Sequence, residues 1–328
     1  MKKNLSILLA MMACLVANAQ TNGLLGLYYE NMILYNPAQA GMNDQLDVNF
    51  GFRRQWAGFG NSPRTVLLSA NGTLNFLGSN QTTENEDSQG AKPSMFTPMK
   101  HGAGGYIRLD ERGSYKQLDI TLIYAIHVRL TQDISLSMGI SPNLYNEKID
   151  LSDITVKDEV NDQTYQSLLQ NGGSNTFLQF NTGLSIYSDR YYLSYGIMQA
   201  AKAFLSGNND LNNNGATMSH QLMAGYRFDL LSNWELVPNT FVKLNKETPT
   251  FVEMGIRARY QQKIWAGLSY RNDNTFVGSF GLIHNNQWKF GYAYEYNTSS
   301  DISQFTNGSH ELILGIRLFN KSNYSMMW

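Results

Sequence analysis

Cysteine is almost absent from this 328-residue chain, and its single copy, Cys14, lies in a short apolar stretch near the N-terminus. The rest of the chain therefore relies neither on disulfides nor on a catalytic thiol. Charge is also scarce, because charged residues make up 16% of the chain, and 25 lysines and arginines nearly match 26 aspartates and glutamates. Without a basic excess or patch, nothing indicates binding to nucleic acid.

Long apolar runs are missing as well. A mean hydropathy of −0.33 argues against a protein built from several membrane-spanning helices. A transmembrane β-barrel is not excluded, because only every second residue of its strands must face lipid. The abundant residue types include tyrosine, with 19 copies, and glycine, with 28. This bias favours strands joined by turns.

Catalytic motifs are also missing. The five histidines fall in no metal-ligand spacing such as HExxH, and no GxSxG nucleophile motif occurs. The run Asp210-x-Asn212-x-Asn214-Gly215 matches the opening of an EF-hand loop, but the twelfth position is Gln221 and the flanks resemble strands. An asparagine- and glycine-rich loop is the better interpretation. The sequence predicts no enzymatic activity, no cofactor and no resident metal.

The N-terminus has the three parts of a secretory signal peptide. Lys2 and Lys3 supply a basic start, and residues 7–16 form an apolar core too short to span a bilayer. Ala17-Asn18-Ala19 then matches the small-x-small cleavage pattern. We expect residues 1–19 to be removed, so that the mature chain begins at Gln20.

Alternation of apolar and polar residues is the main structural signal. Between residues 118 and 130, Leu118, Ile120 and Leu122 begin one apolar face, while Asp119 and Thr121 begin the other. A period of two over this length predicts a long strand. The alternation recurs, with varying clarity, at 46–53, 65–73, 102–110, 134–141, 177–187, 190–199, 218–229, 234–244, 252–259, 263–271, 275–284, 288–296 and 311–318. The count is about 14 strands, an even number as single-chain bacterial barrels have.

The connections between these strands are of two kinds. Short turns are expected at 132–133, 188–189, 231–233, 261–262 and 272–274, and long polar loops at 78–93, 143–175, 201–217 and 297–308. Short periplasmic turns opposite long outer loops are typical of a transmembrane barrel. A soluble all-β protein with solvated outer faces is the alternative, although its strands rarely exceed about ten residues.

The fold prediction is therefore all-β: a transmembrane antiparallel β-barrel of about 14 strands in the bacterial outer membrane. Wall side chains alone cannot fill so wide a barrel. Residues 20–45 precede the first clear strand and are rich in leucine and tyrosine, so we expect a plug-like segment or a partner contact there. Residues 46–319 would form the barrel, and residues 320–328 a C-terminal tail. The charged residues expected to face inward carry both signs and could pair within the lumen. They are Asp47, Arg53, Asp110, Asp119, Arg129, Glu253, Arg257, Arg259, Glu295 and Arg317.

Five short motifs are spread over the whole mature chain: residues 35–41 (YNPAQAG), 52–59 with 63–65 (FRRQWAGF and PRT), 224–228 with Pro238, 265–271 (WAGLSYR) and 308–311 (GSHE). Together they resemble the motifs of the PorP/SprF family of type IX secretion and gliding proteins. Twelve motif residues are candidates for structural or partner-binding roles: Asn36, Pro37, Gly41, Arg53, Gln55, Trp56, Gly58, Tyr270, Arg271, Gly308, Ser309 and His310. Structural roles, such as a turn at Asn36-Pro37, are the simpler interpretation.

The resemblance implies an outer-membrane component of the type IX secretion or gliding machinery. Such a protein would support the secretion or surface anchoring of a large adhesin-like client, and would meet periplasmic peptidoglycan-linked components. The alternative is an outer-membrane channel for small or hydrophobic solutes, which would need an open or gated lumen. An outer-membrane hydrolase ranks last, because no nucleophile and base are visible.

Overall fold

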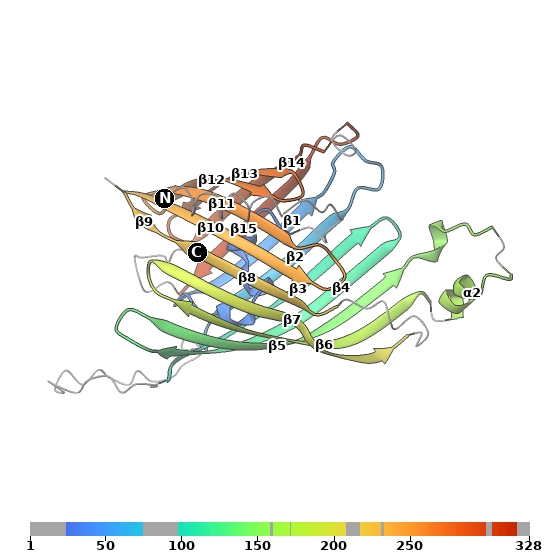
Figure 1. Ribbon diagram of the computed structural model, residues 1–328, viewed down its shortest axis with the longest axis horizontal. Coiled ribbons are helices and arrows are strands. Elements are labelled where there is room, and N and C mark those ends of the chain that lie inside the picture. Colours follow the sequence, from blue (N-terminus) through green and yellow to red (C-terminus); the bar gives the residue numbers. More distant parts are fainter. Residues whose placement is uncertain are drawn as a thin grey trace, which may run out of the picture.

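The computed structural model describes residues 24–74, 98–157, 160–170, 172–207, 217–230, 233–299 and 304–319. These residues form one closed antiparallel sheet, in which each wall strand pairs with the next wall strand along the chain and the first pairs with the last (Figure 1). The strands are β1 (Leu46–Arg54), β2 (Arg64–Thr73), β3 (Pro98–Arg112), β4 (Tyr115–Arg129), β5 (Ser135–Ile149), β6 (Ser174–Tyr187), β7 (Tyr191–Ser206), β8 (Ser219–Tyr226), β9 (Phe228–Asp229), β10 (Trp234–Asn245), β11 (Phe251–Tyr260), β12 (Ile264–Arg271), β13 (Thr275–His284), β14 (Trp288–Asn297) and β15 (Ser309–Leu318).

The predicted count of 14 wall strands is confirmed. The short β9 continues the line of β8 after an interruption at Arg227, and both pair with β10. The helices within the described residues are small: α2 (Gln163–Gln170) and η5 (Leu151–Asp153) lie between β5 and β6, and three single-turn 3-10 helices occur between residue 24 and β1. No helix within the described ranges is long and apolar enough to cross a membrane.

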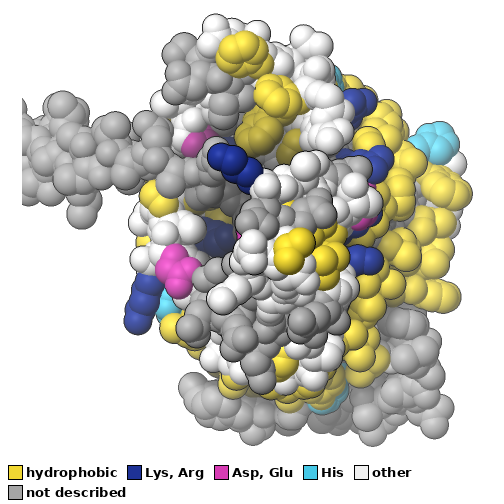
Figure 2. Space-filling model, turned by 90° about the vertical axis from the view of Figure 1, so that its right-hand side faces the viewer, with side chains coloured by type: hydrophobic (Ala, Val, Ile, Leu, Met, Phe, Trp, Pro, Cys, Tyr) yellow, Lys and Arg dark blue, Asp and Glu magenta, His cyan; other side chains and the backbone are white. Residues whose placement is uncertain are grey.

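The two faces of the wall differ as the alternation predicts. In β4, Asp119, Thr121 and His127 point into the barrel and are buried, whereas Leu122 points outward and is 68% exposed. Figure 2 shows the outcome on one flank, where hydrophobic side chains cover the outside of the wall. A closed barrel with an apolar exterior and a polar interior is the transmembrane kind.

The expected connections are wrong in two respects. The loops predicted to begin at residues 143 and 201 begin later, because β5 continues to Ile149 and β7 to Ser206. In the β5 extension polar residues occur on both faces, for example Asn143 inside and Asn146 outside, and in β7 a bulge near Gln199 interrupts the alternation, although the ladder continues in both. Two connections were also expected at the wrong end of the barrel. Strand direction places the short turn 272–274 at the end that carries the long connections 55–63, 150–173 and 298–308. It places the long β2–β3 connection at the opposite end. Composition alone does not tell which end of a barrel a connection faces.

We call these two ends the long-loop end and the short-turn end. The short-turn end carries the connections 130–134, 188–190, 261–263 and 285–287. The wall is uneven: β3 to β7 have 14 to 16 residues each, whereas β11 to β15 have 8 to 10. A transmembrane strand needs about 9–11 residues. The longer strands therefore extend past the bilayer on one side of the barrel.

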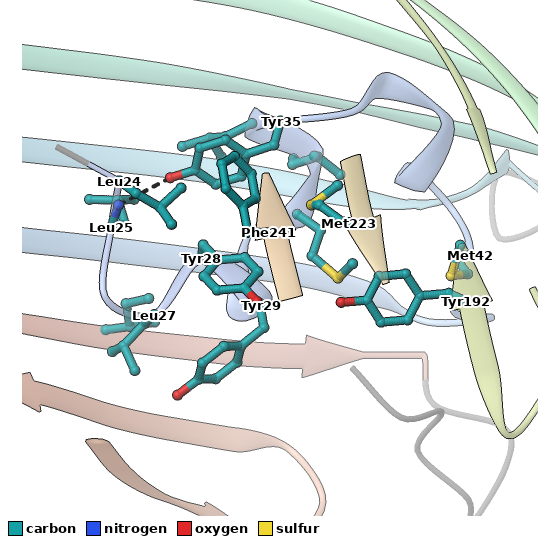
Figure 3. Close-up of a cluster of buried hydrophobic side chains, with 14 of the residues drawn as sticks. Leu24, Leu25, Leu27, Tyr28, Tyr29, Tyr35, Met42, Tyr192, Met223 and Phe241 are labelled. Atoms are coloured by element: carbon teal, nitrogen blue, oxygen red, sulfur yellow. Dashed lines mark hydrogen bonds between the residues drawn. The ribbon is translucent and has the colours of Figure 1, made fainter. Parts of the chain in front are cut away.

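The core lies inside the barrel, where an N-terminal segment meets the wall. This segment, residues 24–42, contains η1 (Tyr28–Glu30), η2 (Met32–Leu34) and η3 (Pro37–Gln39), and nearly all of its side chains are buried. Figure 3 shows its Tyr28 and Tyr35 packed against Phe241 of β10. We refer to residues 24–42 as the luminal segment; it forms the expected plug-like element. Residues 1–23 and 320–328, with the predicted signal peptide and tail, lie outside the described residues.

Replacing a lipid-facing side chain with a charged one tests the membrane band. Leu314 lies in the middle of β15 and is 46% exposed. We expect Leu314→Arg to lower the free energy of unfolding by about 2–4 kcal/mol, measured by urea titration in phospholipid vesicles. Phe276→Arg, near the long-loop end of β13, is the matched control and should cost about 0–1 kcal/mol. Equal losses of unfolding free energy in both variants would contradict a lipid-facing band whose middle lies at the level of Leu314.

Candidate functional site

The luminal segment is held to the wall by its asparagine–proline motif. Asn36 caps η3, and its Oδ1 accepts a hydrogen bond from the Ala38 N–H at 2.8 Å. Pro37 occupies the first helical position, where its fixed φ fits and its missing N–H costs nothing. The Asn36 Nδ2 donates to the Leu184 carbonyl at 3.0 Å and to Ser194 Oγ at 2.6 Å. One buried side chain thus both shapes the turn and fastens it to β6 and β7.

Inward-facing glycines let this turn approach the wall closely. A Cβ at Gly183 would collide with Asn36 Oδ1, and one at Gly139 would collide with the backbone between Pro37 and Ala38. Gly41 has φ +71° and lies against Gly102 of β3, so both partners of that contact must lack a side chain. These glycines form a smooth track on the inside of the wall, and the segment lies on it.

Two of the sequence motifs meet in a buried ion-pair network on the other side of the lumen. Arg53 of β1 bonds Glu295 of β14 at 2.7 Å, and the same carboxylate lies 3.1 Å from Arg271 of β12. Arg271 also bonds Glu253 of β11 at 2.6 Å. The Arg53 guanidinium donates in addition to Gln55 Oε1 at 3.2 Å. Charges that lie far apart in the sequence are therefore neutralised together inside the barrel.

The start of the luminal segment is bonded to the wall on the side of the lumen where the ion-pair network lies. Glu311 of β15 accepts hydrogen bonds from the Gly26 and Leu27 N–H groups at 2.6 and 3.1 Å. Glu30, further along, lies 3.3 Å from Lys289 Nζ and 3.8 Å from Arg257. Both the start and the end of the segment are therefore bonded to the wall, on opposite sides of the lumen.

A third set of motif residues closes the rim at the long-loop end, where β1 and β15 meet. The Trp56 N–H donates to Ser309 Oγ at 3.1 Å, and the Ala57 N–H donates to the Gly308 carbonyl at 2.7 Å. Gly58 and Gly308 have φ of +100° and +85°, values that favour glycine. The loop after β1 is thus pinned to the loop before β15.

Two motif residues face away from the lumen. Tyr270 is 43% exposed, and its hydroxyl donates to Asn274 Oδ1 at 3.0 Å. His310 Nδ1 lies 2.7 Å from the Tyr292 hydroxyl on the outer face of β14. The structure therefore divides the twelve candidates among the luminal segment, the ion-pair network, the rim and the outer face. Their roles in partner binding stay a prediction.

Sequence reasoning placed several of the network's carboxylates on inward faces but did not single them out as site residues. Glu253 and Glu295 were expected to face the lumen, and Glu311 belongs to a quoted motif, yet the pairing of each could not be known. The signal that could have found them is charge at inward positions of strands expected to be neighbours. Lys289 and Glu30 gave no such signal, because their contact crosses from the wall to the luminal segment.

A cavity of about 130 Å³ lies between the luminal segment and the strands at the long-loop end. Its lining includes Arg108, Arg112, Lys243, Tyr145, Phe241 and Gln179. Arg108 pairs with Asp119 at 2.8 Å, and Arg112 pairs with Asp110. Lys243 makes no ion pair within the described ranges. Among the described residues, no group of three or more histidines, cysteines or acidic residues is placed to hold a metal ion.

Comparison with known proteins gives a family match and a fold match. The family model for the type IX secretion system membrane protein PorP/SprF matches residues 17–316. No curated protein matches the sequence. The toluene transporter TbuX of Ralstonia pickettii is similar with a TM-score of 0.51 and 8% identity, over 87% of this chain and 92% of that one. The outer membrane protein Omp33 of Acinetobacter baumannii gives a TM-score of 0.43 and 8% identity, over 85% and 99%. At 8% identity the TbuX match shows the fold alone: an outer-membrane β-barrel.

Adding a methyl group to the glycine track tests how closely the segment lies on the wall. We expect Gly183→Ala to lower the free energy of unfolding by about 1–3 kcal/mol, because the new Cβ overpacks against Asn36. Gly278→Ala is the control, since its Cβ would meet a single atom, Leu268 Cδ2, at 3.9 Å. Thermal unfolding followed by gel mobility in detergent measures both. Equal stability of the two variants would contradict the close approach.

Removing the shared acid tests the ion-pair network. In Glu295→Ala, Arg53 loses the carboxylate to which it is bonded and stays buried, so we expect a loss of about 3–5 kcal/mol in unfolding free energy. Glu247→Ala removes an exposed glutamate of the β10–β11 turn and should change stability by less than about 0.5 kcal/mol. Urea unfolding in vesicles compares them. A loss below about 1 kcal/mol for Glu295→Ala would show that the network is not a structural requirement.

Proposed function

Because this chain belongs to the family of type IX secretion system membrane proteins PorP/SprF, we propose that it supports the secretion or surface anchoring of a large adhesin-like client. The family and the barrel make it an outer-membrane component of type IX secretion. The observation that supports an anchoring role is the filled lumen. A wall braced internally by the luminal segment and buried ion pairs is suited to holding a partner, whereas free passage of a protein needs open space.

The two ends of the barrel fit two kinds of partner. Short turns and chain termini normally face the periplasm, and long loops face outside. In this arrangement the client contacts the long-loop end, where the extended strands β3 to β7, the loop with α2 and the pinned rim at Trp56 and Ser309 lie. The short-turn end meets periplasmic, peptidoglycan-linked components of the secretion or gliding machinery. The mechanism is docking, and the proposal assigns the chain no catalytic step.

A channel for small or hydrophobic solutes is the second candidate function. The cavity of about 130 Å³ at the long-loop end favours it, since a solute could enter the barrel there. Below the cavity, Leu24, Leu34 and Tyr35 of the luminal segment lie across the path. Transport would therefore require this segment to move away from the glycine track.

Deleting the gene and comparing surface and secreted proteins tests the proposal. We expect one or a few large surface proteins to disappear from the cell surface while other exported proteins are unchanged, because anchoring by a docked barrel is specific to a client. Expression of the wild-type gene in the deletion strain is the control and should restore them.

Two other outcomes would contradict a client-specific anchor. Loss of every type IX client would make the barrel a general part of the machine. An unchanged surface proteome would favour the channel, and planar-bilayer conductance of the wild-type barrel, compared with a variant lacking residues 24–42, would then measure it.

A further inference from the structure

A row of basic side chains crosses the outer face of the wall at the long-loop end. Strand register places Arg54 of β1 directly opposite Arg64 of β2, and Lys116 of β4 directly opposite Lys148 of β5. Glu111 of β3 lies between the two pairs, opposite both Arg64 and Lys116. All five residues hold outward positions in the alternation of their strands. We call Arg54, Arg64, Lys116 and Lys148 the basic row.

The basic row lies at the border of the lipid-facing band. On β1 to β4, the outward residues one step further into the wall are all apolar: Phe52, Val66, Leu109 and Leu118. One step is two residues of strand, or about 7 Å. Figure 2, which looks onto this end of the barrel, shows Lys and Arg side chains at the border of the hydrophobic flank. Charge therefore follows apolar surface in the order in which headgroups follow acyl chains.

The neighbouring strands show the depth at which the row begins. His310 of β15 lies opposite Arg54 on one side and opposite Tyr294 of β14 on the other. Aromatic side chains mark the membrane interface of a barrel. The outward residues at this end of β12 to β14 include Tyr270, Phe276, Tyr294 and Tyr296. The row continues this interface, and because barrel strands tilt by about 35–45°, it crosses the headgroup layer obliquely.

Acids of the described chain compensate the row only in part. Glu111 bonds Arg64 at 2.5 Å, and Asp150 bonds Lys116 at 2.9 Å. The Arg64 and Lys116 side chains are 63% and 42% exposed, and ion pairs in such open positions are weak. The other two members of the row form no ion pair with any described residue. Four basic groups thus face two acidic ones, which leaves an excess of positive charge.

The two facing pairs of the row place like charges directly opposite each other. Arg54 faces Arg64, and Lys116 faces Lys148, an arrangement that weakens a sheet. An anion bound between the facing side chains removes this repulsion. A phosphate suits the position, because its oxygens accept several charge-assisted hydrogen bonds at once.

We propose that the basic row binds the phosphate groups of an anionic lipid headgroup in the outer leaflet of the membrane. The long-loop end faces outside, which places the row in that leaflet. The acyl chains of the same lipid then lie along the apolar residues one step further into the wall, such as Phe52 and Leu109. The inference concerns the lipid that surrounds the barrel, so it does not depend on the client or on how the client docks.

Lipid binding by the purified barrel in detergent tests the proposal. The probe is lipid A, a glycolipid with a phosphorylated headgroup, and native mass spectrometry measures its apparent Kd. In the double variant Arg54→Gln/Lys148→Gln we expect the Kd to rise about twentyfold or more, because each basic group near an anionic lipid contributes about fivefold. The matched control, Lys246→Gln/Lys263→Gln, removes two exposed lysines outside the row. Its Kd should change by less than about twofold, because distant exposed charges are screened.

Removing the acid inside the row gives a test with the opposite sign. Glu111→Gln releases Arg64 and adds one positive charge, so we expect lipid A to bind about fivefold more tightly. A purely structural role of the Arg64–Glu111 pair would leave lipid binding unchanged, and that result would contradict the proposal. Phosphatidylcholine, whose headgroup has no net charge, should bind weakly and equally to every variant.

Heat-modifiable gel migration confirms that each variant barrel is folded. Equal affinity for lipid A in the wild type and in Arg54→Gln/Lys148→Gln would overturn the proposal, as would equal binding of lipid A and phosphatidylcholine by the wild type. Displacement of lipid A by inorganic phosphate, beyond the effect of chloride at the same ionic strength, would make the row a site for free phosphate instead. Normal lipid A binding with loss of the client from the cell surface would assign the row to the client.

Discussion

The constraint on which the rest of this structure depends is the width of a closed 14-strand sheet. Wall side chains cannot fill such a barrel, and an unfilled lumen would be a water channel. Here residues 24–42 fill most of the lumen, and their contacts determine which residue types occur on the inner face of the wall. Glycines occur where the segment touches the wall, and serines or amides occur where its polar groups need partners. The apolar residues that would form a soluble core are divided between the segment and the lipid-facing surface.

The charges inside the barrel follow from the same filling. A lumen filled by protein excludes most water, so each buried ion must be bonded to an opposite one. The ladder from Arg53 through Glu295 and Arg271 to Glu253 meets this requirement, and Glu30 extends the pairing to the luminal segment. At the long-loop end, above the segment, Lys243 lines the cavity and makes no ion pair with any described residue.

Sequence reasoning recovered the fold well because period-two alternation is a local signal. A wall strand lies at each of the 14 predicted positions, and the inward direction of residues such as Asp119 and Arg53 was confirmed. The strand ends of β5 and β7 were missed, since polar residues occupy both faces of the β5 extension and a bulge near Gln199 interrupts the alternation in β7. The pairing of Arg271 with Glu253 and Glu295 was also out of reach. It depends on register across neighbouring strands, which a single sequence leaves undetermined. The glycine track could not be predicted from the sequence either, because glycine is also common at turns and its presence does not show which segment lies against it.

The bond between the luminal segment and the last strand bears on how the protein is made. Gly26 and Glu311 are separated by 285 positions in sequence. Strand β1 likewise gains its second neighbour, β15, only when β15 joins the sheet. The β1–β15 pairing and the packing of the luminal segment can therefore form only after the last strand has been synthesised. A nascent or truncated polypeptide has two unmatched strand edges and a segment with no acid to cap it. Such long-range contacts form late and slowly. Sealing of the membrane wall and filling of its interior thus become one terminal event of biogenesis, which gives quality control a single state to recognise.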